Sequence, residues 1–173
     1  GLRINEALSL RVGDVLLDKG FLVILEAKND DSRLVPMSHS LLMRMQTYIE
    51  SVDYPNEKPL FQTSTGHAVS DSHAYEWFRW MLWRAGIPHR GRGKGPRLHD
   101  LRHTFAVHSL QAAVERGLDP YAFLPILSVY LGHKNLSATE RYLRLTSEAY
   151  PYLTKEMDKI MDSIIPEVQD YEE

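Results

Sequence analysis

The stretch His99-Asp100-Leu101-Arg102-His103 opens a helix that the sequence predicts from about His99 to Arg116, followed by Gly117. Glycine is common just after a helix because it adopts the left-handed conformation without strain. His99 and Arg102 are three residues apart, so a helix presents the imidazole and the guanidinium on one face. Taken alone, His99 could simply be a residue at the helix start and Arg102 a cation on the surface. The rest of the chain decides between this interpretation and a functional one.

Downstream of this helix, the chain carries start signals for two more helices. Asp119-Pro120 combines an N-cap with proline at the first helical position, and that helix is predicted to end at Gly132. Ser137-Ala138-Thr139-Glu140 is a capping box, which predicts a helix from about Ala138 with Tyr142 in its second turn. A last amphipathic helix is predicted over residues 150–165, able to pack on its own domain or on a neighbouring protomer.

Upstream, the sequence predicts a short helix and a β-hairpin. Residues 3–9 place apolar side chains at helical spacing, and residues 21–27 and 33–37 are rich in strand-forming residues. The residues between these two strands have turn chemistry, with Lys28 at the lip of the turn. Pro36 cannot donate a ladder hydrogen bond, so its strand is predicted at a sheet edge.

Two further helices are predicted over residues 38–52 and from Ser70 or Asp71 to about Ala85. The second is predicted to have an apolar face made of Tyr75, Phe78, Met81 and Leu82. It also holds three tryptophans, Trp77, Trp80 and Trp83. These rings could stack on bases, but we expect them to pack in the core. The predicted fold class is α+β, mostly α-helical with one small antiparallel β-sheet.

The composition fits a soluble globular domain. The chain has 173 residues, of which 43% are apolar and 25% charged, enough for one domain with a buried core. It has no cysteine, which excludes disulfides and thiolate zinc sites and agrees with a cytoplasmic location. No apolar run is long enough to span a membrane. The acidic end, residues 166–173, is predicted to be a disordered tail.

The net charge of −3 does not by itself indicate a protein that binds nucleic acid. The distribution of charge is more informative, because residues 89–103 concentrate positive charge against a single acid, Asp100. The basic residues of this segment are Arg90, Arg92, Lys94, Arg97 and Arg102. Such a segment suits a partner that offers phosphates at one place, although a solvated loop has the same composition.

The residue types fit the attack of a tyrosine on a phosphodiester. Charge moves onto the non-bridging oxygens in that reaction, so catalysis depends on positioning and electrostatics. Guanidinium groups suit those oxygens because they stay charged and donate paired hydrogen bonds. The phenol must lose its proton and the departing 5′-oxygen must gain one, which a lysine or histidine can supply. This chemistry requires no metal and no cofactor.

The ordered set of these residues resembles the signature of the tyrosine recombinases, which include phage and transposon integrases and Xer-type resolvases. The family pattern is an arginine in Gly-Leu-Arg, a lysine in a β-hairpin, His-x-x-Arg, Leu-Gly-His and then a tyrosine. The matching residues are Arg3, Lys28, His99, Arg102, His133 and Tyr142, with Tyr142 nine residues beyond His133. The glycines that commonly flank the lysine are replaced here by Ala27 and Asn29. The match covers essentially the whole chain and implies the tyrosine recombinase catalytic-domain fold.

The resemblance also implies how the strand would be cut. Tyr142 would attack the scissile phosphate, leaving a 3′-phosphotyrosine and a free 5′-hydroxyl. Lys28 would be the general acid toward the 5′-oxygen, and His99 would assist proton transfer near the tyrosine.

The remaining matches would bind the phosphate. Arg3 and Arg102 would clamp its non-bridging oxygens, and His133 would add a hydrogen bond. Glu6 would orient Arg3, since the family places an acid three residues beyond this arginine. In the basic segment, the expected DNA contacts are Arg90, Arg92, Lys94 and Arg97.

In the family, a core-binding domain joins the catalytic domain to form a clamp around DNA. Because Gly1 lies at the first catalytic motif, residues 1–173 are expected to be a single catalytic domain, truncated at its N-terminus and without that partner domain. The expected partner is double-stranded DNA. Four protomers would form the recombination synapse in the full-length protein, whereas the fragment is expected to be a monomer.

Other interpretations use some of the same residues. A type IB topoisomerase would share the chemistry without exchanging partners, and a DNA-binding accessory protein would have lost catalysis. His99 and His103 could form a metal pair in a nuclease, but Arg102 lies between them and no acid is suitably placed. Tyr150 and Tyr152 are rival nucleophiles, although neither has the family spacing.

Overall fold

The computed structural model describes residues 1–25, 32–88, 91 and 94–149, with side chains as far as Leu143. Several predicted features lie outside the described residues: Lys28, Arg90, Arg92, Tyr150, Tyr152, the last helix and the acidic tail. The chain divides into two compact units, residues 2–102 and the residues from His103 onward together with Gly1. Each unit has buried apolar residues of its own.

The first unit contains a three-stranded antiparallel sheet in the order β1-β2-β3. Its strands are β1 (Val15–Leu16), β2 (Phe21–Leu25) and β3 (Ser32–Pro36). β2 and β3 form the predicted hairpin, and β3 is an edge strand whose last residue is Pro36, as expected for a residue without an N–H. The sequence did not predict β1, because two residues carry no readable alternation.

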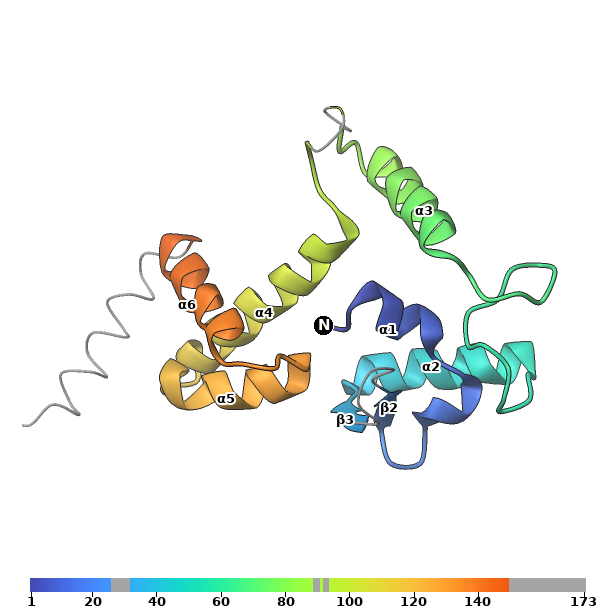
Figure 1. Ribbon diagram of the computed structural model, residues 1–173, viewed down its shortest axis with the longest axis horizontal. Coiled ribbons are helices and arrows are strands. Elements are labelled where there is room, and N and C mark those ends of the chain that lie inside the picture. The colour runs from blue at the N-terminus through green and yellow to red at the C-terminus, as the bar shows by residue number, and fades with distance from the viewer. Residues whose placement is uncertain (26–31, 89–90, 92–93, 150–173) are drawn as a thin grey trace, which may run out of the picture. The chain divides into compact units, whose positions relative to one another are not determined.

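The three α-helices of this unit lie where the sequence predicted, whereas its short 3-10 helix was not predicted. The α-helices are α1 (Ile4–Ser9), α2 (His39–Val52) and α3 (Asp71–Arg84), which Figure 1 labels, and the 3-10 helix is η1 (Val12–Asp14). The Ser38 hydroxyl accepts from the backbone N–H of Leu41 at the start of α2. The Ser70 hydroxyl accepts a hydrogen bond from the backbone N–H of His73 at the start of α3. Both serines are therefore N-caps, which confirms the predicted starts.

The tryptophans of α3 are not in the core, so that prediction was wrong. Their exposed fractions are 52% for Trp77, 56% for Trp80 and 73% for Trp83. Phe78 and Leu82, four residues apart, form the buried face of α3, and the spacing of the tryptophans turns them away from it. Two residues predicted on the apolar face are exposed as well, Tyr75 and Met81.

The second unit is helical in its described part. Its elements are most of α4 (Leu98–Glu115), then α5 (Pro120–Leu131) and α6 (Ser137–Ala149) (Figure 1). The Asp119 carboxylate accepts from the backbone N–H of Tyr121 at 2.8 Å, and α5 ends at Gly132 in the left-handed conformation, both as predicted. The core of the second unit contains the buried residues Ala106, Leu110, Leu124, Leu127, Leu131, Tyr142 and Leu143. No helix in the described ranges is long and apolar enough to cross a membrane.

The cap of α6 differs from the predicted capping box. The side-chain oxygen of Asn135 accepts from the backbone N–H of Ala138 at 3.3 Å and from the Ser137 hydroxyl at 3.0 Å. Asparagine competes well for such backbone donors. As a result, α6 begins at Ser137, one residue earlier than predicted, and Tyr142 lies in its second turn.

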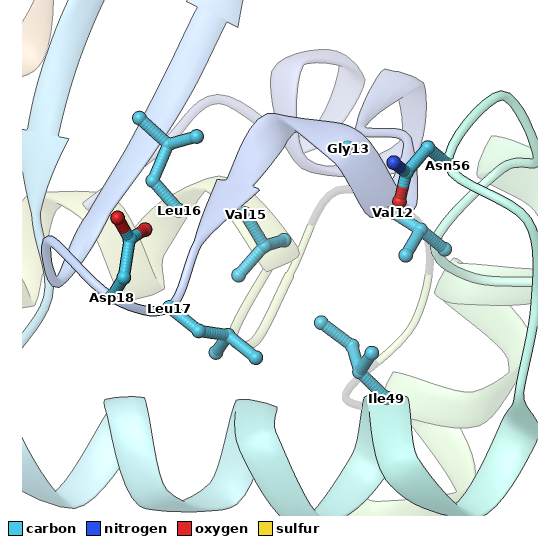
Figure 2. A pocket seen from close by; sticks show the side chains of 8 residues that line it. All are labelled: Val12, Gly13, Val15, Leu16, Leu17, Asp18, Ile49 and Asn56. Carbon is cyan, nitrogen blue, oxygen red and sulfur yellow. The ribbon is translucent and has the colours of Figure 1, made fainter.

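An open pocket in the first unit lies away from the predicted chemistry. It is lined by Val12, Gly13, Val15, Leu16, Leu17, Asp18, Ile49 and Asn56. Figure 2 shows the apolar side chains of η1, β1 and α2 around it. None of its lining residues is one of the expected site residues, so we assign it no role in the reaction.

Candidate active site

The N-terminus of α1 carries a carboxylate that is held by its neighbouring arginine. Glu6 accepts a hydrogen bond from the backbone N–H of Arg3 at 2.8 Å and another from Arg3 Nη1 at 2.7 Å. The first bond satisfies one of the backbone donors that a helix start leaves open. The second fixes the guanidinium of Arg3, whose side chain is 40% exposed.

Two more arginines converge on the same carboxylate. Arg33 Nη2 lies 2.9 Å from Glu6 Oε2, and Arg102 Nη1 lies 3.9 Å from that oxygen. The side chain of Arg102 is only 3% exposed, and that of Glu6 is 10% exposed. Among the described residues, three guanidinium groups around one carboxylate give an excess of positive charge. We name Arg3, Glu6, Arg33 and Arg102 the arginine cluster, and its charge suits an anion such as a phosphate.

Glu6 stays ionised in this setting. Burial alone would raise the pKa of Glu6, but hydrogen bonds from Arg33 and Arg3 outweigh it and hold that pKa below its ordinary value. The ionised form is therefore favoured in the folded state. A depressed pKa contributes stability that is present above the unfolded-state pKa, near ~4.3, and is lost as the pH falls through the folded-state pKa.

Replacing Glu6 by glutamine should consequently destabilise the protein most at neutral pH. We expect a loss of about 2 kcal/mol in the free energy of unfolding at pH 7, because the arginines lose their charged partner. The difference from the wild type should shrink as the pH falls below ~4.3. Urea unfolding at pH 7 and pH 3 measures it, with the exposed Glu57→Gln as the matched control. A difference that stays constant with pH would contradict this account.

The start of α4 places His99 near positive charge. The carboxylate of Asp100 accepts from the backbone N–H of Arg97 at 2.8 Å and pairs with its guanidinium at 3.0 Å. Partial desolvation and the charges of Arg102, Arg97 and Arg3 lower the pKa of His99, although Asp100 opposes them. The imidazole is therefore mainly neutral near pH 7, the form that can accept a proton.

In the second unit, Tyr142 is buried and its hydroxyl is engaged. Its side chain is 2% exposed, and its oxygen lies 3.0 Å from Nδ1 of His103. The ring of His133 lies nearly parallel to that of Tyr142, with an interplanar angle of 14° and centroids 6.2 Å apart. Two histidines, one from α4 and one from the turn before α6, therefore contact the predicted nucleophile.

His133 is itself held by a buried threonine. Its Nδ1 lies 2.7 Å from Thr139 Oγ1, and Thr139 is fully buried on α6. This hydrogen bond fixes the plane of the ring. When the threonine hydroxyl donates, the ring proton is on Nε2, and that nitrogen can donate to an anion.

The contact between His103 and Tyr142 can be tested without DNA. We expect His103→Leu to increase the nitration of Tyr142 by tetranitromethane, because the substitution removes the hydrogen bond that holds the phenol inside. Digestion after glutamate gives the peptide 141–148, in which Tyr142 is the only tyrosine. The exposed Tyr121 should be nitrated equally in both proteins. Equal nitration of Tyr142 in both would mean that His103 does not hold it.

The structure thus places the expected residues in two groups. Arg3, Glu6, His99 and Arg102 lie in the first unit, and His133 and Tyr142 in the second. Lys94 and Arg97 are exposed. Among the described residues, no group of three or more histidine, cysteine, aspartate and glutamate side chains is placed to hold a metal ion.

Three residues of these groups were not assigned a role from the sequence: Arg33, His103 and Thr139. A sequence signal exists for two of them. Arg33 is two residues before the buried Val35 and so falls on the inner face of its strand. Thr139 is three residues before Tyr142 and shares its helix face.

The sequence and the fold of this chain are similar to those of known proteins. The profile of the phage integrase family matches residues 1–149. The protein y4rB of Sinorhizobium fredii is 34% identical over 148 residues, which cover 83% of this chain and 47% of y4rB. Tyrosine recombinase XerA of Pyrococcus horikoshii is 31% identical over 148 residues, covering 86% of this chain and 47% of XerA. The chain spans about half the length of the curated relatives it matches.

Solved structures confirm the fold prediction. A crystal structure of XerA recombinase superposes with a TM-score of 0.66 at 23% identity, covering 86% of this chain and 52% of that one. The XerH site-specific recombinase bound to its difH substrate in a pre-cleavage complex has a TM-score of 0.62 at 26% identity, covering 87% of this chain and 42% of that one. Since the family profile covers most of the sequence, the chain belongs to the phage integrase family of tyrosine recombinases.

Proposed function

We propose that this chain carries the catalytic residues of a site-specific recombinase that cuts and rejoins double-stranded DNA through Tyr142. The observation that carries the proposal is the arginine cluster, in which three guanidinium groups surround one carboxylate. Such a cluster has positive charge in excess and suits the oxygens of a phosphodiester. The DNA complex of the similar XerH recombinase supports DNA as the partner.

In the cleavage step, the Tyr142 oxygen attacks the scissile phosphorus. An O–P bond forms to the tyrosine, the bond from phosphorus to the 5′-oxygen breaks, and the products are a 3′-phosphotyrosine and a free 5′-hydroxyl. The phenol gives up its proton, and the 5′-oxygen receives one. We assign that second proton to Lys28, whose position in the sequence matches the lysine of the family, and proton transfer near the phenol to His99.

The other residues bind the reacting phosphate. Arg3 and Arg102 neutralise the charge on its non-bridging oxygens as the transition state forms, and His133 donates a further hydrogen bond. Glu6 holds Arg3 in place. Lys94 and Arg97, with the basic residues beside them, bind the DNA backbone.

Rejoining reverses the same step. The 5′-hydroxyl of a second strand attacks the phosphotyrosine, the phosphodiester forms again, and Tyr142 regains its proton. Because the covalent intermediate conserves the bond energy, the exchange needs no ATP. Exchange between two duplexes uses four protomers, one for each strand that is cut.

A duplex nicked close to the cleavage site tests the proposal. With the intact protein in EDTA, loss of the short 5′-hydroxyl fragment should trap a covalent protein–DNA adduct on a denaturing gel. Addition of a second duplex with a free 5′-hydroxyl should give joined product. Exchange of strands between two intact duplexes that carry the site, which a nicking and resealing topoisomerase would not favour, distinguishes a recombinase. DNA binding without any adduct would instead indicate an accessory protein.

A further inference from the structure

Arg33 occupies a position in β3 that sequence alternation assigns to the core. Val35, two residues further along β3, lies on the same face of the strand and is buried. Ile24, the residue of β2 that pairs with Arg33, is buried too. The side chain of Arg33 is only 13% exposed. Burying a charged side chain at such a position costs free energy unless the charge is paired. The presence of Arg33 here is therefore explained by an oppositely charged partner.

One partner of Arg33 is Glu6, which lies 27 residues away in the chain. Arg33 Nη2 donates to Glu6 Oε2 at 2.9 Å, and Arg3 Nη1 donates to the other carboxylate oxygen at 2.7 Å. The carboxylate is thus held between the sheet and the start of α1. Arg3 is the more exposed of these two arginines, and Arg33 lies behind the carboxylate.

Arg33 also affects the net charge of the arginine cluster. Glu6 orients Arg3, but its negative charge also offsets part of the positive field that a phosphate would meet. A second cation against the same carboxylate restores that field, since among the described residues Arg3, Arg33 and Arg102 outnumber Glu6, the acid that they surround. Arg33 therefore lets Glu6 hold Arg3 without neutralising the cluster.

We propose that Arg33 is a positioning residue for DNA cleavage, acting through Glu6 to fix Arg3 and to preserve the positive charge of the arginine cluster. The inference rests on the proposed function, because it assigns the cluster to the scissile phosphate. The proposal predicts that Arg33 affects the cleavage step more than DNA binding, and that its effect is smaller when Glu6 is already neutral.

The experiment is a double-mutant cycle with Arg33→Met, Glu6→Gln and the double variant. The single-turnover cleavage rate is measured on the nicked duplex with saturating intact protein, together with the Kd for DNA and the Tm. We expect Arg33→Met to lower the rate about tenfold or more while the Kd changes less than about threefold. Arg33→Lys, which keeps the charge but not the planar fork, should recover part of the rate. Arg33→Met should lower the rate less in the Glu6→Gln background than in the wild type.

The exposed Arg44 of α2 supplies the matched control, since Arg44→Met should leave rate, Kd and Tm unchanged. If Arg33→Met unfolds at the assay temperature, Arg33→Gln takes its place, because it keeps a donor without the charge. A folded Arg33 variant with the wild-type rate, or additive losses in the double variant, would overturn the inference alone. A wild-type protein that binds DNA but forms no adduct would overturn the proposed function and this inference with it.

Discussion

Replacing Tyr142 by phenylalanine is expected to abolish covalent DNA cleavage, with a rate loss of about 10⁴-fold or more, because the variant lacks the attacking oxygen. The ring itself would keep its place in the core of the second unit, beside Leu131 and Leu143. Loss of the hydrogen bond to His103 should cost about 1 kcal/mol of stability, so the variant remains folded. The readout is adduct formation on the nicked duplex in EDTA.

Tyr121→Phe is the matched control for this experiment. Tyr121 lies in the first turn of α5 and its side chain is exposed, so its hydroxyl has no expected part in the reaction. This variant should form the adduct at the wild-type rate. Persistence of the adduct in Tyr142→Phe, at a rate close to that of the control, would remove Tyr142 from the mechanism.

Replacing Arg102 by lysine should also have a large effect, about 10²- to 10³-fold on the cleavage rate. Lysine keeps the positive charge but cannot donate two parallel hydrogen bonds from a rigid plane. Arg102 is buried and contributes to the arginine cluster through Glu6, so a shorter, compact cation would leave the phosphate oxygens poorly held. Single-turnover cleavage with saturating protein isolates this effect from DNA affinity.

An arginine-to-lysine substitution near the other end of α4 shows whether replacing any arginine of this region lowers the cleavage rate. Arg116 follows α4 directly and is exposed, so Arg116→Lys should cleave like the wild type. The Tm of both variants shows whether folding is affected. Wild-type cleavage by Arg102→Lys, with an unchanged Tm, would mean that the guanidinium fork is not needed for the reaction.

Much of the fold could be predicted because its signals are local. Ser38 and Ser70 cap their helices, Asp119 and Gly132 bound α5, and Pro36 ends an edge strand. Each of these features depends on the residues immediately around it. The two-residue strand β1 was too short to show a pattern.

The errors and omissions involve partners that are distant in sequence. The tryptophans of α3 were expected in the core because large aromatic rings usually are, yet Phe78 and Leu82 already define the buried face of that helix. The contact of Arg33 with Glu6 spans 27 residues and that of His103 with Tyr142 spans 39. No helical or strand periodicity reports such a contact, so only the folded structure brings these residues together.

The location of the covalent bond tests the central claim most directly. The protein–DNA adduct is trapped on the nicked duplex, the DNA is trimmed with nuclease, and the protein is digested after glutamate. Tyr142 is then the only tyrosine of peptide 141–148, whereas Tyr150 and Tyr152 share peptide 149–156. We predict a nucleotide on peptide 141–148, attached through the Tyr142 oxygen. A nucleotide on peptide 149–156 would preserve the reaction but contradict the assignment of Tyr142 as the nucleophile.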